Sequence, residues 1–341
     1  MTDTLKIIES TEMGSLGVYH VKRYWHKSLL KKQGTLPQNA FQDEWNIDNT
    51  LLAILSLGLE QTIKHVFNNE PSFEEFENWI LALNNNKLDT DKIQQFNAYI
   101  ENRQLPFTQQ EIDNPVLSEA DMDFWNEHGY VILRNAIPKE DCENAIAAIC
   151  EHIEIDRHDP ATWYGAHPSR QGIMVQLFQH PALEKNRQSE KIRRAYEQLW
   201  QRKDIWMNTD RVGFNPPETT NWKFPGPRMH WDVSLKQPIP LGLQGILYLA
   251  DTAAHQGAFT LVPGFHNKAA DWLNGLPAGA DPRMEDIYAL GTLPIVASAG
   301  DFIIWHHALP HGSSANTSTE PRFVQYMNLQ PLDAEKHDEW I

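Results

Sequence analysis

The sequence predicts a mainly β protein of the sandwich or jelly-roll class, with flanking helices and an α-helical region in front of it. Three observations favour this fold. Apolar residues recur at helical spacing in the first third of the chain. Two prolines then interrupt this helical pattern. Beyond residue 204, short apolar runs alternate with Pro, Gly and Asn. Many short strands separated by such turns are typical of two packed antiparallel sheets.

The chain is expected to divide into two parts near residue 110. Residues 1–110 form a helical N-terminal region without any pattern that points to catalysis, and its aromatic residues are expected in a core. Residues 104–115 contain two prolines and polar residues, which is typical of a linker. Residues 111–341 form the β domain, which is long enough for a large core.

Helices in the N-terminal region are predicted from spacing and caps. A dense apolar run lies between Leu51 and Val66. Ser72 is followed three residues later by Glu75, the spacing of a capping box, so a helix is expected to begin there. A further helix is predicted over residues 91–100.

The β domain is expected to begin with helices and to continue as strands. Ser118 predicts the start of a helix that runs to His128, and residues 138–153 predict an amphipathic helix. Residues 269–293 are expected to form a lid, because long loops without regular structure are often functional. The predicted strands are residues 129–134, 211–214, 245–250, 258–262, 293–297, 302–306 and 322–328.

Composition restricts the class of partner. The chain has 29 Lys and Arg against 45 Asp and Glu, a net charge of −16, which argues against nucleic acid because phosphate binding needs a basic face. Cys142 and Cys150 are the only cysteines, so no disulfide framework is expected. No signal peptide and no apolar stretch of membrane-spanning length is recognised, so the sequence predicts a cytoplasmic protein without a membrane contact.

The motif that carries chemistry is His230-Trp231-Asp232. Side chains alternate along a strand, so positions 230 and 232 point the same way and can hold one ion. His311, just past a predicted strand, is the best candidate for a third ligand.

Two imidazoles and one carboxylate on one face leave the opposite face open. This arrangement is typical of non-haem Fe(II) oxygenases, whose open positions bind a co-substrate and O₂. Zinc accepts the same ligands, but structural zinc sites close the fourth position and often use Cys. A His-x-Asp motif alone is a weak signal of a metal site. The residues downstream of it, His311 and Arg322, make the assignment more specific.

Arg322 follows His311 by eleven residues, across a turn-rich loop. The turn is expected to bring Arg322 near the metal without making it a ligand. A guanidinium there suits the far carboxylate of a dicarboxylate co-substrate such as 2-oxoglutarate, because its fork donates two parallel hydrogen bonds. Taken alone, the residue is better explained as a surface arginine at a strand start, and the co-substrate role is favoured only together with His230, Asp232 and His311.

At this point the sequence resembles the phytanoyl-CoA dioxygenase family of 2-oxoglutarate oxygenases, over roughly residues 115–335. Phe265 departs from the small polar residue that is common in the family, and the first hundred residues have no counterpart in it. The combined pattern is specific, whereas each piece alone is not. The stretches that carry the likeness are residues 117–137, 230–232, 257–266 and 300–322.

The resemblance implies a double-stranded β-helix, the cupin-like form of the jelly roll. It also implies hydroxylation of a C–H bond in a small metabolite, with O₂ as a co-substrate and release of succinate and CO₂. Related halogenases carry a small residue in place of the carboxylate ligand, so the Asp at position 232 favours hydroxylation. The residues that would bind Fe(II) are His230, Asp232 and His311, and those that would bind 2-oxoglutarate are Arg322, Ser313 and Tyr248.

The substrate is not readable from the sequence. Cationic and aromatic residues near the ligand motif suit a small acid or polar metabolite, although ordinary barrel packing explains them equally well. The substrate candidates are Arg211, Trp222, Arg228 and Trp231. Asp301 and His306 are candidates for orienting the ligating imidazoles.

A second hypothesis is a non-catalytic metal-binding jelly-roll protein that acts as a binding or interaction module, because a fold does not determine a function. The enzyme hypothesis is favoured, because a retired site has no physical need for Arg322 beside three metal ligands. The N-terminal region is expected to mediate self-association or a protein contact, which is compatible with either hypothesis.

Overall fold

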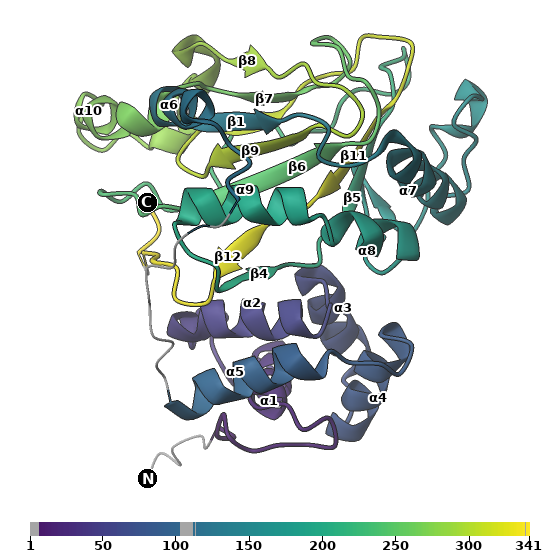
Figure 1. Cartoon of the computed structure of the whole chain (residues 1–341), viewed down its shortest axis with the longest axis vertical. Helices are drawn as coiled ribbons and strands as arrows, with labels where there is room; N and C mark the ends of the chain where they lie inside the picture. The colour runs from purple at the N-terminus through teal and green to yellow at the C-terminus, as the bar shows by residue number, and fades with distance from the viewer. Residues whose placement is uncertain (1–6, 103–111, 113, 338) are drawn as a thin grey trace. The chain divides into compact units, whose positions relative to one another are not determined.

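The computed structural model describes residues 7–102, 112, 114–337 and 339–341, and most of the predicted linker at residues 104–115 lies outside them. The chain forms two compact units (Figure 1). The N-terminal unit comprises residues 1–109, 206–209 and 331–333, and the β unit comprises residues 110–205, 210–330 and 334–341.

The N-terminal unit contains helices packed around one apolar core, in which Leu51, Phe76 and Phe96 are at most 1% exposed. Ser72 begins α4 as predicted, because its hydroxyl accepts from the Glu75 N–H at 3.3 Å and its own N–H donates to the Glu75 carboxylate at 2.7 Å. The helices are α1 (Val21–Lys32), α2 (Trp45–Ile54), α3 (Leu59–Asn69), α4 (Phe73–Leu83) and α5 (Thr90–Asn102), with the short 3₁₀ helix η1 (Gln42–Glu44) before α2.

Two features of this unit differ from expectation. The apolar run from Leu51 to Val66 is divided between α2 and α3, and the chain turns between them with Ser56 at a φ of 50°. Helix α1 was not predicted, because basic and aromatic residues interrupt its apolar stripe and hide the helical spacing.

The β unit is a jelly roll of two antiparallel sheets, which confirms the predicted fold. The larger sheet has the order β1-β9-β6-β11-β5-β3-β2, and the smaller has the order β10-β7-β8. Its strands are β1 (Tyr130–Leu133), β2 (Arg170–Gln171), β3 (Met174–Val175), β5 (Val212–Asn215), β6 (Leu243–Tyr248), β7 (Phe259–Leu261), β8 (Leu293–Pro294), β9 (Phe302–His306), β10 (His311–Ser313) and β11 (Arg322–Tyr326). A separate pair joins β4 (Ile205–Met207) to β12 (Leu329–Pro331).

The chain passes back and forth between the two sheets. It runs through β6 in the larger sheet, β7 and β8 in the smaller, β9 in the larger, β10 in the smaller and β11 in the larger. This winding is that of a double-stranded β-helix. Because the chain crosses repeatedly from one sheet to the other, residues far apart in sequence face one another across the interior.

Helices cover the outer face of the larger sheet. Asn186 of α8 donates to the Gln325 side chain of β11 at 2.9 Å, and the ring of Tyr196 of α9 lies 6.1 Å from that of Phe302 on β9. The helices of the β unit are α6 (Glu119–His128), α7 (Lys139–His152), α8 (Pro181–Arg187), α9 (Glu190–Trp200) and α10 (Ala269–Asn274). The predicted helices at residues 118–128 and 138–153 are therefore confirmed within a residue.

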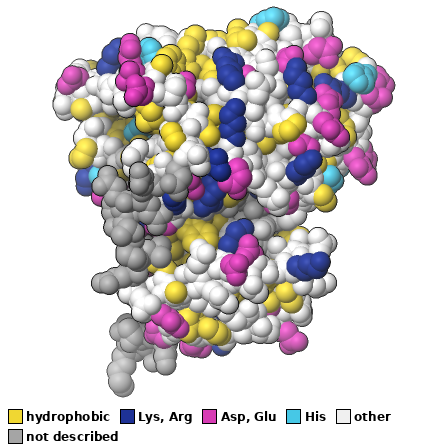
Figure 2. Space-filling view, viewed as in Figure 1, with side chains coloured by type: hydrophobic (Ala, Val, Ile, Leu, Met, Phe, Trp, Pro, Cys, Tyr) yellow, Lys and Arg dark blue, Asp and Glu magenta, His cyan; other side chains and the backbone are white. Residues whose placement is uncertain are grey.

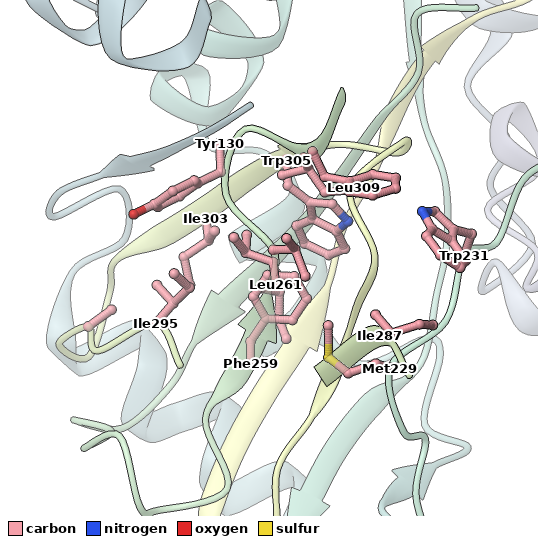
Figure 3. Close-up of a cluster of buried hydrophobic side chains, with 14 of the residues drawn as sticks. Tyr130, Met229, Trp231, Phe259, Leu261, Ile287, Ile295, Ile303, Trp305 and Leu309 are labelled. Carbon is pink, nitrogen blue, oxygen red and sulfur yellow. The ribbon is translucent and has the colours of Figure 1, made fainter. Parts of the chain in front are cut away.

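The inner faces of the two sheets carry the core of the β unit. Strand alternation directs Ile246 and Tyr248 of β6 inward, together with Ile303 and Trp305 of β9. They meet side chains of the smaller sheet, and Figure 3 shows Phe259 and Leu261 of β7 together with Trp305 of β9.

The predicted strands occur, and most are shorter than predicted. Residues 269–293 are not an irregular loop, because they contain α10 and the 3₁₀ helices η4 (Pro282–Met284) and η5 (Ile287–Leu290). Another 3₁₀ helix, η3 (Phe265–Asn267), precedes them, and η2 (Pro160–Thr162) lies after α7.

Surface charge and helix length bear on possible partners. Basic and acidic side chains are intermingled on the face in Figure 2. Among the residues that the structure describes, no helix is both long and apolar enough to cross a membrane.

Candidate metal and co-substrate site

The two candidate histidine ligands lie opposite one another in an antiparallel pair. The N–H of His230 donates to the carbonyl of His311, and the N–H of His311 donates to that of His230, both at 2.9 Å. The segment at His230 thus extends the smaller sheet beyond β10. Directly paired residues project to the same side of a sheet, and the two ring centroids lie 4.8 Å apart.

Asp232 completes a group of three. Its Oδ1 lies 3.2 Å from Nε2 of His230, and its Oδ2 lies 3.3 Å from Nε2 of His311. The three potential ligand atoms all lie within 4.8 Å of one another. We call His230, Asp232 and His311 the β-unit triad. The structure brings together the three residues that the sequence proposed as metal ligands.

The protons of the two imidazoles point away from Asp232. Nδ1 of His230 lies 2.6 Å from the carbonyl oxygen of Arg228, and Nδ1 of His311 lies 3.0 Å from that of Leu309. A carbonyl oxygen only accepts, so each Nδ1 must carry the proton, and in a neutral imidazole Nε2 then presents a lone pair. Three electron-pair donors therefore face one another, and they need a cation between them.

The pKa values of Asp232 and His230 are shifted in the directions that favour positive charge between the three side chains. Burial would raise the pKa of Asp232, but the two imidazoles outweigh it and hold this pKa well below its usual range. Burial would lower the pKa of His230, but Asp232 outweighs that effect and raises it. Protons on Nε2 or a divalent metal ion would satisfy the triad, and the donor set suits a metal with open positions.

The cysteines play no part in this group. Cys142 and Cys150 are buried on α7, and burial raises the pKa of their thiols to about 12 and about 11. A thiolate is the form that binds metal, so neither residue is suited to a zinc site.

Arg322 begins β11 and points into the interior. It is 0% exposed, and its Nη2 donates to the hydroxyl of Ser313 at 3.1 Å. Its Nε and Nη1 have no hydrogen-bond partner among the described residues. A buried guanidinium with unpaired N–H groups is costly, so this fork is suited to a carboxylate from a bound molecule.

Ser313 links Arg322 to the strand that carries His311. Ser313 and His311 are two residues apart on β10, so both point inward, roughly 7 Å apart along the strand. This spacing fits a short dicarboxylate with one end at the triad and the other at Arg322.

Tyr248 lies beside Arg322, but its hydroxyl is already engaged. It donates to the carbonyl of Ile295 and accepts from the N–H of Phe259, both at 2.9 Å. Burial raises its pKa to about 12, although Arg322 acts in the opposite direction. These bonds tie β6 to the smaller sheet, so they support Arg322 rather than leave Tyr248 as a ready donor to the co-substrate.

Two residues near Asp232 were missed from the sequence. Gln244 on β6 donates to Oδ2 of Asp232 at 2.7 Å. Arg283 of η4 donates to the carbonyl oxygens on both sides of Asp232, to Trp231 at 3.0 Å and to Val233 at 2.6 Å. Strand alternation could have placed Gln244 inward, but no motif signals its partner.

The substrate candidates have different environments. Trp231 is 3% exposed in the core, and its indole N–H donates to the carbonyl of Ala308 at 2.9 Å. This corrects the expectation that it contacts substrate, because the residue between two ligands alternates to the other face. Arg228 is exposed and lies two residues before His230. Trp222 is half-buried 6.1 Å from the ring of Tyr164, and Arg211 is half-buried beside Asp210.

The residues proposed to orient the imidazoles do not do so. Asp301 binds the Arg134 side chain and the N–H of Asn135, and Nδ1 of His306 accepts from the N–H of Ala308. Backbone carbonyl oxygens hold the ligating rings instead, and a carbonyl has no signature in the sequence.

A model of one known family matches much of the chain. It is described as phytanoyl-CoA dioxygenase (PhyH) and matches residues 125–324. A Dictyostelium discoideum protein named "Putative phytanoyl-CoA dioxygenase" is 25% identical over 266 residues, covering 61% of this chain and 74% of that protein.

Solved structures with some similarity include EctD from S. alaskensis with bound Fe. It has a TM-score of 0.48 and 15% identity, covering 67% of this chain and 82% of that chain. The non-heme alpha ketoglutarate dependent carbocyclase SnoK from nogalamycin biosynthesis has a TM-score of 0.44 and 19% identity, covering 69% of this chain and 90% of that chain.

Proposed function

This chain belongs to the phytanoyl-CoA dioxygenase family, and from that premise we propose that it is a non-haem iron(II)- and 2-oxoglutarate-dependent dioxygenase. Its proposed reaction is hydroxylation of a C–H bond in a small molecule. The observation that carries the proposal is Arg322, a fully buried guanidinium in which two nitrogens, Nε and Nη1, have no hydrogen-bond partner among the described residues. Its third nitrogen donates to Ser313, which lies two residues beyond His311 on β10.

The β-unit triad would hold the iron. His230 and His311 offer Nε2, because their Nδ1 protons are directed to backbone carbonyls. Asp232 contributes the negative charge that favours a divalent ion and is 48% exposed, so this side of the triad is open to solvent. Two imidazoles and one carboxylate leave positions for a co-substrate and O₂.

Arg322 and Ser313 would bind the far carboxylate of 2-oxoglutarate. The guanidinium can donate two charge-assisted hydrogen bonds, and the bond from Ser313 keeps the fork in place. Because the Arg322 side chain is buried, the ion pair would form away from competing water and would set the direction in which the co-substrate lies.

When bound, iron and 2-oxoglutarate together supply the oxidising chemistry, with succinate and CO₂ as co-products. The chain's residues position the reacting bond and exclude other reactions. Arg228 is the candidate for a substrate contact, because it is exposed and lies two residues before His230. Its charge would favour a substrate with an anionic group.

The test is an anaerobic titration with Fe(II) and then 2-oxoglutarate, following the weak visible charge-transfer band of the chelate. We expect the band in the wild type and its loss in Asp232→Ala. Arg322→Met should keep its affinity for Fe(II) and lose roughly 10- to 100-fold in affinity for 2-oxoglutarate, the loss expected from removing charged hydrogen bonds.

The matched control is Arg193→Met, because Arg193 lies on α9 and pairs with Glu197. It should leave the band unchanged. Tight zinc binding without any 2-oxoglutarate band in the wild type would contradict the proposal. That outcome would favour a non-catalytic metal-binding jelly roll.

A further inference from the structure

Gln244 connects Asp232 to the larger sheet. Asp232 lies on a bend just after the bridged residue His230, where no ladder holds its backbone. Gln244 lies on β6, which is hydrogen-bonded on both sides, by β9 and β11. Its 2.7 Å bond to Oδ2 of Asp232 therefore fixes a half-exposed carboxylate to the middle of a rigid sheet.

Trp305 determines which way the amide of Gln244 points. It is the direct neighbour of Gln244 across β6 and β9, and its indole N–H donates to Oε1 of Gln244 at 3.1 Å. An indole N–H can only donate, so it must face the amide oxygen. The NH₂ group of Gln244 is then left to face Asp232, where a donor is needed.

The surroundings of Trp305 hold this arrangement in place. Trp305 is 3% exposed, and its ring centroid lies 4.3 Å from that of Phe259 and 5.1 Å from that of His311. The same tryptophan thus packs against one metal ligand and orients the residue that holds another.

We infer, on the basis of the proposed function, that Gln244 is a positioning residue for Asp232 and that Trp305 acts through it. Both oxygens of Asp232 face an imidazole, Oδ1 that of His230 and Oδ2 that of His311, but only Oδ2 also accepts from Gln244. Because that bond competes for the electron pairs of Oδ2, we expect Oδ1 to be the oxygen that binds the metal. A carboxylate that binds through one oxygen leaves one more coordination position free than a carboxylate that chelates with two. Gln244 thereby helps to keep open the positions that co-substrates require.

The experiment measures Co(II) binding to the otherwise metal-free protein, by titration and by the d–d absorption spectrum, without 2-oxoglutarate or turnover. Gln244→Met keeps the length of the side chain and removes the donor. We expect roughly 10- to 100-fold weaker binding, as for other residues that support metal ligands, and a changed spectrum because Asp232 is free to reorient.

Trp305→Phe keeps an aromatic ring and removes only the N–H, so a smaller loss of Co(II) affinity is expected. Trp200→Phe is its matched control, because the indole N–H of Trp200 likewise donates one hydrogen bond, here to the carbonyl of Leu329 at 2.9 Å, but Trp200 lies on α9. The control should bind Co(II) as the wild type does. If Gln244→Met fails to fold, as judged by thermal unfolding, Trp305→Phe still tests the inference.

The double variant decides whether the two residues act together. If Trp305 works through Gln244, adding Trp305→Phe to Gln244→Met should weaken Co(II) binding by less than about twofold more, because coupled residues are not additive. A full additional loss would overturn the role given to Trp305. Wild-type affinity and spectrum in Gln244→Met would overturn the inference. Neither result depends on iron or 2-oxoglutarate, so failure of the proposed function would be seen separately.

Discussion

His230, Asp232 and His311 in the β unit, and His20, Glu44 and Asp48 in the N-terminal unit, are alike in composition. Among the described residues, these are the groups of His and carboxylate side chains whose potential ligand atoms all lie within 4.8 Å of one another. We call the second group the N-terminal triad. The two groups differ in where their histidine protons point and in which cation is already present.

The histidine of the N-terminal triad directs its proton at a carboxylate. Nε2 of His20 lies 2.9 Å from Oδ1 of Asp48, and Nδ1 lies 3.0 Å from the hydroxyl of Ser10. A carboxylate only accepts, whereas a hydroxyl can donate, so Nε2 carries the proton. In the β-unit triad the carbonyls hold the protons on Nδ1, and Nε2 is free to bind metal.

The N-terminal triad also contains its own cation. Lys27 is 2% exposed, and its ammonium donates to the two oxygens of Asp48 at 2.9 and 3.0 Å and also binds Glu44. Arg23 binds Glu44 as well. Beside the β-unit triad, the guanidinium of Arg283 donates to the backbone carbonyls of Trp231 and Val233 and not to the Asp232 carboxylate.

The comparison teaches that closeness of histidine and carboxylate does not define a metal site. What matters is whether the imidazole lone pair faces the carboxylate and whether a protein cation already compensates the charge. By both criteria the N-terminal triad is a buried ion-pair cluster. The β-unit triad still needs a cation.

The largest effect should come from removing one carboxylate from each triad. Asp232→Ala should abolish Fe(II) or Co(II) binding, because loss of a ligand should exceed the 10- to 100-fold that loss of a supporting residue costs. Asp48→Ala should leave metal affinity unchanged. Equilibrium titration checks both variants, and equal loss in the two would show that the triads are not chemically distinct.

The β-unit triad was accessible to sequence analysis because its signals are local. Two ligands at i and i+2 follow from strand alternation, and the turn between His311 and Arg322 suggests their proximity. The same alternation should have placed Trp231 on the opposite face. Gln244 was not accessible, because its contact with Asp232 depends on how residues 231–242 return to β6, which no spacing encodes.

The N-terminal triad had no sequence signature. His20 is separated from Glu44 and Asp48 by α1 and a connecting segment, and their meeting depends on how α1 packs in its unit. Residue patterns predicted the structure where the contacts are between near neighbours in sequence, as in the capping box at Ser72. The fold class of the β unit followed from turns and short strands, whereas the carbonyls that orient the ligands come from the backbone and leave no trace in residue type.

The second effect concerns the cation in the N-terminal triad. Lys27→Met should destabilise the protein by about 3 kcal/mol, because it leaves two partly buried carboxylates, those of Glu44 and Asp48, without the cation that they share. Asp232→Asn should change the stability of the metal-free protein much less, because the Asp232 side chain is 48% exposed. Urea denaturation followed by circular dichroism compares the two, and similar losses would argue against the distinction.

A third effect is the response to acid. Burial would raise the pKa of Glu44, but Arg23 and Lys27 outweigh it and lower this pKa to about 2 from an ordinary value of 4.5. The stability that Glu44 contributes is therefore present above about pH 4.5 and is lost as the pH falls towards 2, by roughly 3 kcal/mol in total. Glu44→Gln should be less stable at pH 7 and lack this part of the decline, measured by denaturation at each pH.

The smallest effect isolates the proton on His20. Ser10→Ala removes the hydroxyl that donates to Nδ1 and should cost about 1 kcal/mol, the usual net value of a hydrogen bond. Asp48 still demands the proton on Nε2, so the tautomer should not change, and the variant should not gain affinity for Co(II). A gain would mean that Ser10, rather than Asp48, keeps this histidine from binding metal. The corresponding bonds of His230 and His311 go to backbone carbonyls, so their tautomers cannot be altered by substituting a side chain that accepts the proton.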